Sequence, residues 1–219
     1  MAAENNTYLK VHSLPREAKE AMQQLDKYGV VVLEFLSGQK EKLAEMRKRI
    51  RNAAFNSPEM KKTATSSVMG AFGAPGNVGS FHDPDIRDLR TIIYGYLTPL
   101  MKQNIQDYLP GYMIEMLIDR LLVDASGSTS ETCHRDEAEH ALPDDHLWAS
   151  WFNPNETPDK FICAPGSHKD AVGNKGFAKE DENKYLHLKT TVVVPPGCLI
   201  VFCPRIVHWV AKYSKKEQK

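Results

Sequence analysis

The sequence Thr-Cys-His-Arg-Asp-Glu, at residues 132–137, is the stretch around which the rest of the chain can be arranged. Side chains alternate between the two faces of a strand, so in an extended conformation His134 and Asp136 lie on the same face. An imidazole beside a carboxylate supplies two of the three protein ligands of the two-His-one-carboxylate site. That site binds non-haem Fe(II) on one side and leaves coordination positions open. The stretch therefore predicts a strand that carries part of a metal site.

A second His-x-Asp match, at His168 and Asp170, competes with the first. Motifs this short also arise by chance. The second match directly follows Pro-Gly-Ser at residues 165–167 and enters a segment containing Gly and Asn. That composition is typical of a turn and loop, in which residues two positions apart need not share a face. We therefore favour His134 and Asp136 as the metal ligands.

The third ligand should come from a later strand, and His208 is the favoured residue. It lies near the end of an apolar, hairpin-like run at residues 198–210. A lone histidine on an apolar strand is more often a buried core residue, and His208 gains weight only because the first two ligands need a partner. The other histidines that stay open as weaker candidates are His82, His140, His146 and His187.

Composition limits the class of protein. The 219 residues are 42% hydrophobic, which is enough for one globular domain with a sizeable core. The formal net charge is zero, whereas nucleic-acid-binding proteins usually show a basic excess, so we expect no strong nucleic-acid partner. No apolar segment of the sequence approaches the ~20 residues of a membrane span, so we expect no membrane partner.

The cysteines and the first residues indicate the compartment. The four cysteines, at positions 133, 163, 198 and 203, show no Cys-x-x-Cys spacing and are expected to be reduced thiols rather than a disulfide or zinc site. The chain begins without the basic region and apolar run of a secretory signal. We therefore expect an intracellular, cytoplasmic protein.

The first 110 residues are expected to be mostly helical. Apolar residues at helical spacing predict a helix that ends at Gly29, followed by a buried strand at residues 30–36. A second helix is expected after Ser37, and a third runs from Pro84 towards residue 109 with an interruption near Pro99. Between them, residues 56–82 include a Gly-rich, almost uncharged stretch, which we read either as a mobile substrate lid or as a linker.

After residue 110 the pattern becomes extended. A long apolar run at residues 113–123 is followed by short strand-like runs separated by turns such as Pro195-Pro196-Gly197. Many short strands joined by Pro/Gly turns indicate a β-sandwich or a closed barrel. The short runs are residues 147–152, 160–163, 189–194, 198–203 and 206–213, with another around His134.

The order of these motifs resembles the Fe(II)/2-oxoglutarate-dependent dioxygenase superfamily. The motifs are His134-Arg135-Asp136, the Trp-containing run at 147–152, Ala-Pro-Gly-Ser-His at 164–168, and Pro-Gly-Cys-Leu-Ile-Val-Phe at 196–202 before His208. The phytanoyl-CoA dioxygenase-like branch, which includes uncharacterised viral and microbial members, is the nearest. The resemblance covers residues 112–212, and the first hundred residues resemble the family only loosely, as a helical cap.

The resemblance implies a mainly β fold with N-terminal helices: a double-stranded β-helix, or jelly-roll/cupin-like barrel, flanked by helices. We expect one dioxygenase domain over residues 1–219. Residues 1–110 would form its mostly helical part, with the lid loop at about 56–82. Residues 111–219 would form the barrel core, and the alternative that this core lacks its last strand stays open.

The resemblance also implies the site residues. His134, Asp136 and His208 would hold the iron, and Trp151 matches an aromatic residue near the co-substrate in relatives. Relatives place a basic residue on the last strand to pair with the far carboxylate of 2-oxoglutarate, and no arginine lies there in this sequence. The candidate anchors are Lys212 and Arg120, with Lys215, Lys216, Lys219 and Arg205 as further alternatives.

The implied reaction couples oxidation of 2-oxoglutarate by O2, which releases succinate and CO2, to hydroxylation of a substrate. The substrate stays open among small molecules, protein side chains and nucleobases, as does the oligomeric state. Two alternatives to this dioxygenase also stay open. One is a catalytically silent barrel that serves as a binding or scaffold module, and the other is a cupin-type metalloenzyme that does not use 2-oxoglutarate.

Overall fold

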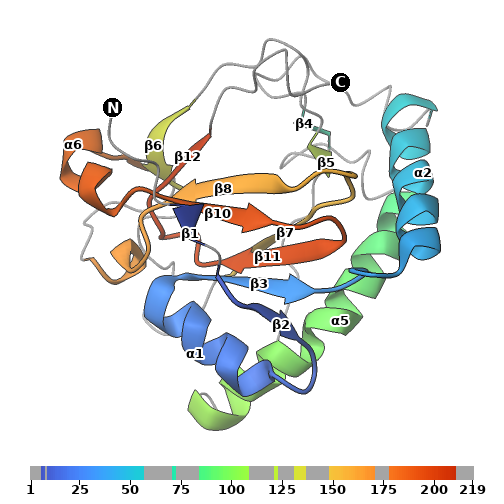
Figure 1. Ribbon diagram of the computed structural model, residues 1–219, viewed down its shortest axis with the longest axis horizontal. Coiled ribbons are helices and arrows are strands. Elements are labelled where there is room, and N and C mark those ends of the chain that lie inside the picture. The colour runs from blue at the N-terminus through green and yellow to red at the C-terminus, as the bar shows by residue number, and fades with distance from the viewer. Residues whose placement is uncertain are drawn as a thin grey trace. The chain divides into compact units, whose positions relative to one another are not determined.

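The computed structural model describes residues 6–7, 9–56, 71–72, 84–108, 121–122, 131–136, 148–170 and 178–210 (Figure 1). The chain divides into two compact units. The first comprises Met1–Gly38 and Ser130–Ala211, and the second comprises Gln39–Thr129 and Lys212–Lys219. Strands from both ends of the sequence therefore meet in the first unit.

The larger sheet of the first unit has six strands and carries the His134 region. All neighbouring strands are antiparallel except β1 and β10, which are parallel. Its strand order is β1 (Asn6–Thr7), β10 (Thr190–Val194), β8 (Asp159–Cys163), β12 (His208–Val210), β6 (Glu131–Arg135) and β9 (Ala178–Lys179).

The smaller sheet of this unit has four strands. β2 and β3 are parallel, and the other neighbours are antiparallel. The order is β2 (Val11–Ser13), β3 (Val30–Glu34), β11 (Cys198–Phe202) and β7 (Ala149–Phe152). The buried strand predicted from residue 30 onward is confirmed, since the four residues Val30–Leu33 are fully buried. Helix α1 (Ala18–Tyr28) packs against β2 and β3, and Gly29 ends it in a left-handed conformation as predicted.

Side chains from the two sheets pack together in one hydrophobic core. Val32 and Ile200 enter it from the smaller sheet, and Phe161 and Val192 enter it from the larger one. Burying each of these side chains stabilises the fold by roughly 1.5–3 kcal/mol. Among the described strands the two sheets do not close on each other, so the observed architecture is a pair of mainly antiparallel sheets with helices.

A second, smaller cluster covers the other face of the six-stranded sheet. Its members alternate along the strands with the residues of the first core, because successive side chains point to opposite faces. Helix α6 (Glu182–Tyr185) supplies Tyr185, and the Trp209 indole Nε1 donates a hydrogen bond to Glu182 at 3.0 Å. The buried members are Cys133, Ala164, Tyr185, Val207 and Trp209.

The second unit contains the longer helices, α2 (Lys40–Asn56) and α5 (Pro84–Tyr108), and the strand pair β4 (Ala71–Phe72) and β5 (Leu121–Leu122). As predicted, α5 begins at Pro84, but the interruption expected near Pro99 is wrong, since the helix continues through it. Leu97 and Leu100 are buried on either side, and this packing offsets the backbone hydrogen bond that a proline removes.

Several predictions fall largely outside the described residues. Of the lid loop at residues 56–82, only Asn56 and the strand Ala71–Phe72 are described, and of the run at residues 113–123 only Leu121–Leu122. In the parts of the chain that the structure covers, no helix combines the length and apolar character needed to cross a bilayer.

Gly197 joins the two sheets, and we expect substitution there to be unusually costly. It lies in the Pro-Pro-Gly turn between β10 and β11 with φ of 78°, and a Cβ atom would lie 2.8 Å from the carbonyl carbon of Leu36. Gly38 has a similar φ of 76°, but a Cβ there would meet nothing within 4 Å. Gly38→Ala should lower the free energy of unfolding by about 1–2 kcal/mol through backbone strain alone. Gly197→Ala should lower it by roughly 2 kcal/mol more, because backbone atoms must also shift. Urea unfolding of both variants measures this, and equal losses would contradict it.

Candidate metal centre

The centre begins with a pair of histidines on neighbouring strands. His134 on β6 lies directly opposite His208 on β12 in the antiparallel register. Cross-strand neighbours present their side chains on the same face of a sheet. The two imidazole rings accordingly lie with their centroids 4.3 Å apart. The register shifts just after His208, between it and Val210, so the histidine pair lies beside an irregularity in the ladder.

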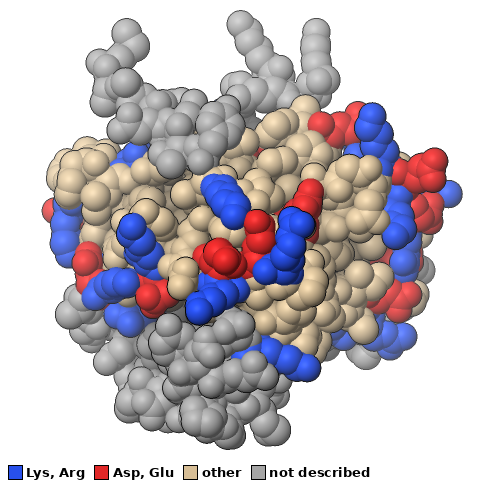
Figure 2. Space-filling view, turned by 60° about the horizontal axis from the view of Figure 1, so that its bottom comes forward, with Lys and Arg blue, Asp and Glu red and all other residues tan. Residues whose placement is uncertain are grey.

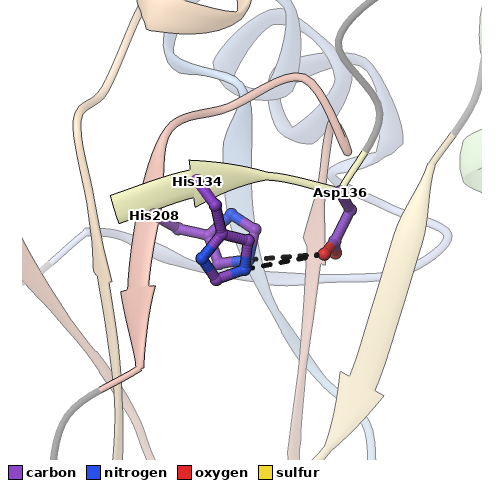
Figure 3. A group of neighbouring side chains, drawn as sticks. All are labelled: His134, Asp136 and His208. Atoms are coloured by element: carbon purple, nitrogen blue, oxygen red, sulfur yellow. Dashed lines mark ion pairs between the residues drawn. The ribbon is translucent and has the colours of Figure 1, made fainter. Parts of the chain in front are cut away.

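Asp136 completes the group from the residue just beyond β6 (Figure 3). Its Oδ1 atom lies 3.8 Å from Nε2 of His134 and 3.8 Å from Nε2 of His208. One ligand atom from each residue lies within 4.8 Å of the others, as a single ion would require. In the part of the chain that the structure describes, this is the one cluster of His, Cys, Asp or Glu side chains that could hold a metal ion.

Burial differs between the members of the group. His134 and His208 are 3% and 6% exposed, whereas the Asp136 side chain is 44% exposed. Nδ1 of His208 lies 3.1 Å from the carbonyl oxygen of Ile206. A carbonyl can only accept, so this contact requires a proton on Nδ1 and leaves the Nε2 lone pair directed at the cluster. The protein therefore encloses the imidazoles and leaves the carboxylate side accessible.

Aromatic side chains hold the His208 ring in place. The Phe161 ring is stacked on it with centroids 5.5 Å apart, and the Phe202 ring meets it at 60° with centroids 5.8 Å apart. Both phenylalanines are buried in the core between the sheets. Sequence reasoning did not single out these two residues, although strand alternation places Phe161 and Cys163 on the same face of β8.

The second His-x-Asp match has no such convergence. His168 lies in the 3-10 helix η1 (Ser167–Lys169), where its Nε2 is 3.0 Å from the carbonyl oxygen of Asp26. Burial lowers the pKa of His168. Asp170 instead accepts a hydrogen bond from the Tyr185 hydroxyl at 2.9 Å. The loop composition that set this match aside agrees with these separate contacts.

Only some of the predicted co-substrate residues and weaker histidine candidates lie among the described residues. Trp151 lies on β7, half-buried against the same core as Phe161 and Phe202. Arg205 lies in the turn before β12, and its guanidinium donates to the carbonyl of Asp170 at 3.1 Å. His187 is exposed in η2 (Leu186–Leu188). The candidates outside the described residues are Lys212, Arg120, Lys215, Lys216, Lys219, His82, His140 and His146.

Surface charge shows no single sign on the face drawn in Figure 2. The described cationic and anionic side chains are interleaved there, as expected for a chain with zero formal net charge. That no strong nucleic-acid partner exists stays a prediction from the net charge.

The cysteines are poorly suited to nucleophilic catalysis. All four are free, and Cys133, Cys163 and Cys198 are buried. Burial raises the pKa of the Cys163 thiol well above its ordinary value and that of Cys198 to about 11. The reactive form of cysteine is the thiolate, so these thiols are unreactive near neutral pH.

The fold is similar to that of solved enzymes. The non-heme alpha-ketoglutarate-dependent carbocyclase SnoK from nogalamycin biosynthesis matches with a TM-score of 0.57 at 16% identity, over 90% of this chain and 78% of that chain. The epimerase SnoN in complex with Fe3+, alpha-ketoglutarate and nogalamycin RO matches with a TM-score of 0.55 at 19% identity, over 91% and 79% of the two chains. Another SnoN structure gives 0.55 at 17% identity, over 91% and 77%. No protein-family model matches the chain, and no curated protein is significantly similar in sequence. At sequence identities of 16–19%, this structural similarity establishes the fold alone.

Removing the carboxylate should test the cluster directly. We expect Asp136→Ala to lose stoichiometric Fe(II) binding, because two neutral imidazoles alone make a poor site for this metal. Anaerobic isothermal titration calorimetry of the folded variant measures the loss. Asp26→Ala is the control, since its side chain is 78% exposed and pairs only loosely with Lys169 at 3.9 Å. Full Fe(II) binding by Asp136→Ala would rule the carboxylate out as a ligand.

The thiols should resist alkylation in the folded protein. We expect iodoacetamide at pH 7.5 to modify Cys163 and Cys198 far more slowly in the native state than in urea, because burial restricts access and the raised pKa leaves little thiolate. Mass spectrometry of tryptic peptides measures the modified fraction. Rapid native modification of either residue would contradict their description as inert core thiols.

Proposed function

We propose that this protein is a non-haem Fe(II)/2-oxoglutarate-dependent oxygenase of the phytanoyl-CoA dioxygenase-like branch. The observation that carries the proposal is the convergence of two histidine Nε2 atoms and one Asp136 oxygen between neighbouring strands. The fold supports it, because solved structures of similar fold are described as alpha-ketoglutarate-dependent enzymes. We further infer that the two facing sheets are the halves of a double-stranded β-helix.

The residues present fit the iron that this function requires. Two neutral imidazole nitrogens and one carboxylate are the donor set of the facial site that leaves positions open for other ligands. The His208 tautomer, fixed by the Ile206 carbonyl, presents an unprotonated Nε2. The exposed Asp136 beside two buried histidines supports entry of co-substrate and substrate from the carboxylate side.

The protein's contribution is to hold, orient and shield. When bound, iron with 2-oxoglutarate and O2 supplies the oxidation, which yields succinate, CO2 and a hydroxylated substrate. His134, Asp136 and His208 would hold the metal. Phe161 and Phe202 pack against the His208 ring and exclude water behind it. The substrate class is open, and no partner protein is proposed.

The co-substrate carboxylate needs a cation, because burying it unpaired is costly. We propose Lys212 as this anchor, because it is the first basic residue after His208 in the sequence. Arg120 is the second candidate. Trp151, which packs against the core between the sheets, is proposed to lie beside the co-substrate.

Succinate formation tests both the reaction and the anchor. We expect the wild type to convert 2-oxoglutarate slowly to succinate without added substrate, in an Fe(II)- and O2-dependent manner, and His208→Ala to abolish this turnover. Lys212→Ala should raise KM for 2-oxoglutarate at least about tenfold, because a charge-assisted pair is lost. Lys215→Ala is the matched control and should leave KM unchanged.

Two results would count against parts of this proposal. A wild type that binds Fe(II) yet forms no succinate would contradict the oxygenase and favour the silent barrel or the cupin-type metalloenzyme. An unchanged KM in Lys212→Ala would overturn Lys212 alone and move the anchor to Arg120.

A further inference from the structure

Arg135, the middle residue of the His134-Arg135-Asp136 motif, is fully buried. Alternation along β6 turns it to the opposite face of the sheet from His134, into the layer formed with Tyr185. An arginine is almost never buried unless its charge is paired and its donors are used. The contacts of this guanidinium therefore show how its charge is compensated and which segments it connects.

The guanidinium is bonded on every nitrogen. Nε donates to Glu180 Oε1 at 2.6 Å, and Nη2 donates to the Tyr185 hydroxyl at 2.9 Å. Nη1 donates to the backbone carbonyls of Ser167, at 2.9 Å, and of Arg205. These contacts link β6 to four residues that lie 32 to 70 positions further along the chain.

Two of these contacts lead to His208. Arg205 lies three residues before His208, so its carbonyl fixes the entry into β12. The Ser167 carbonyl accepts a hydrogen bond from Arg135, and the Ser167 Oγ accepts one from the Val207 backbone N–H at 2.9 Å. The same guanidinium thus holds both the strand that carries His134 and the turn that delivers His208.

The acid of the second His-x-Asp match belongs to this network. Asp170 Oδ2 accepts a hydrogen bond from the Tyr185 hydroxyl at 2.9 Å and lies 3.8 Å from Arg135 Nη2. Glu180 is held in turn, since its backbone N–H donates to the Cys133 carbonyl at 3.0 Å. Two carboxylates therefore balance the buried charge, and the planar fork fixes its direction.

We infer that Arg135 is a positioning residue for the metal centre, which sets the separation of His134 and His208 by bridging β6 to the turn before β12. This inference rests on the proposed function, because the spacing of the two histidines matters for metal binding. Asp170 and Tyr185 support the centre through Arg135 and bind no metal themselves.

The test uses Co(II) binding by the full chain, with affinity from calorimetry and the visible absorption spectrum as a signature of ligand geometry. Arg135→Lys keeps the charge but loses the fork. Tyr185→Phe removes one hydroxyl and is the variant expected to stay folded where Arg135→Lys does not. We expect Tyr185→Phe to weaken Co(II) binding at least about threefold and Arg135→Lys at least about tenfold, with an altered spectrum in both.

Two controls separate positioning from stability. Lys169→Gln removes a surface contact to Asp26, at 3.9 Å and with a 55% exposed side chain, and should bind Co(II) like the wild type. Val194→Ala cuts a cavity in the core between the sheets, so it should lower the melting temperature and leave the Co(II) affinity and spectrum unchanged.

The outcomes separate the two claims. Weakened binding in Tyr185→Phe beside unchanged binding in Val194→Ala supports the inference. Wild-type affinity and spectrum in a folded Tyr185→Phe or Arg135→Lys variant overturn it while leaving the proposed function intact. A wild type that binds no Co(II) overturns both.

Discussion

The pairing of β6 with β12 is the constraint on which the rest of the site depends. Side chains in a strand alternate, so only a register that sets His134 opposite His208 brings both imidazoles to one face. A slip of one residue would carry one ring to the other side of the sheet and leave Asp136 with a single partner. The described contacts around the two strands, on both faces, act to keep this register.

The same alternation gives the six-stranded sheet two different faces. On the inner face, Phe161 and, from the smaller sheet, Phe202 pack around His208 within the core that the two sheets share. On the outer face, Arg135 and Tyr185 form a polar layer whose hydrogen bonds reach the turn before His208. Apolar packing thus fixes the His208 ring, and charged hydrogen bonds fix the backbone that carries it.

Much of this could be predicted from sequence because it depends on local pattern. The strands near residues 30, 160, 190 and 198 follow from apolar runs bounded by Gly and Pro. The strand around His134 and the three residues of the candidate centre follow instead from the spacing of His134 and Asp136 and from the need for a third ligand. What failed depends on tertiary contacts. The continuation of α5 through Pro99 follows from burial of its neighbours, and the pairing of Asp170 with Arg135 joins residues 35 positions apart. Side-chain alternation alone predicts that Arg135 lies on the opposite face of the sheet from His134, but the hydrogen-bond partners of Arg135 could not be predicted from the sequence.

The central claim is that His134, Asp136 and His208 bind one metal ion and leave room for 2-oxoglutarate. A crystal structure of the protein soaked with Mn(II) and 2-oxoglutarate under anaerobic conditions tests it most directly. We predict one Mn(II) bound by Nε2 of both histidines and by the Asp136 carboxylate, with 2-oxoglutarate as a further ligand of the same ion. Mn(II) bound elsewhere, for instance at His168 and Asp170, or a fully loaded crystal in which the three side chains do not contact the ion, would contradict the claim.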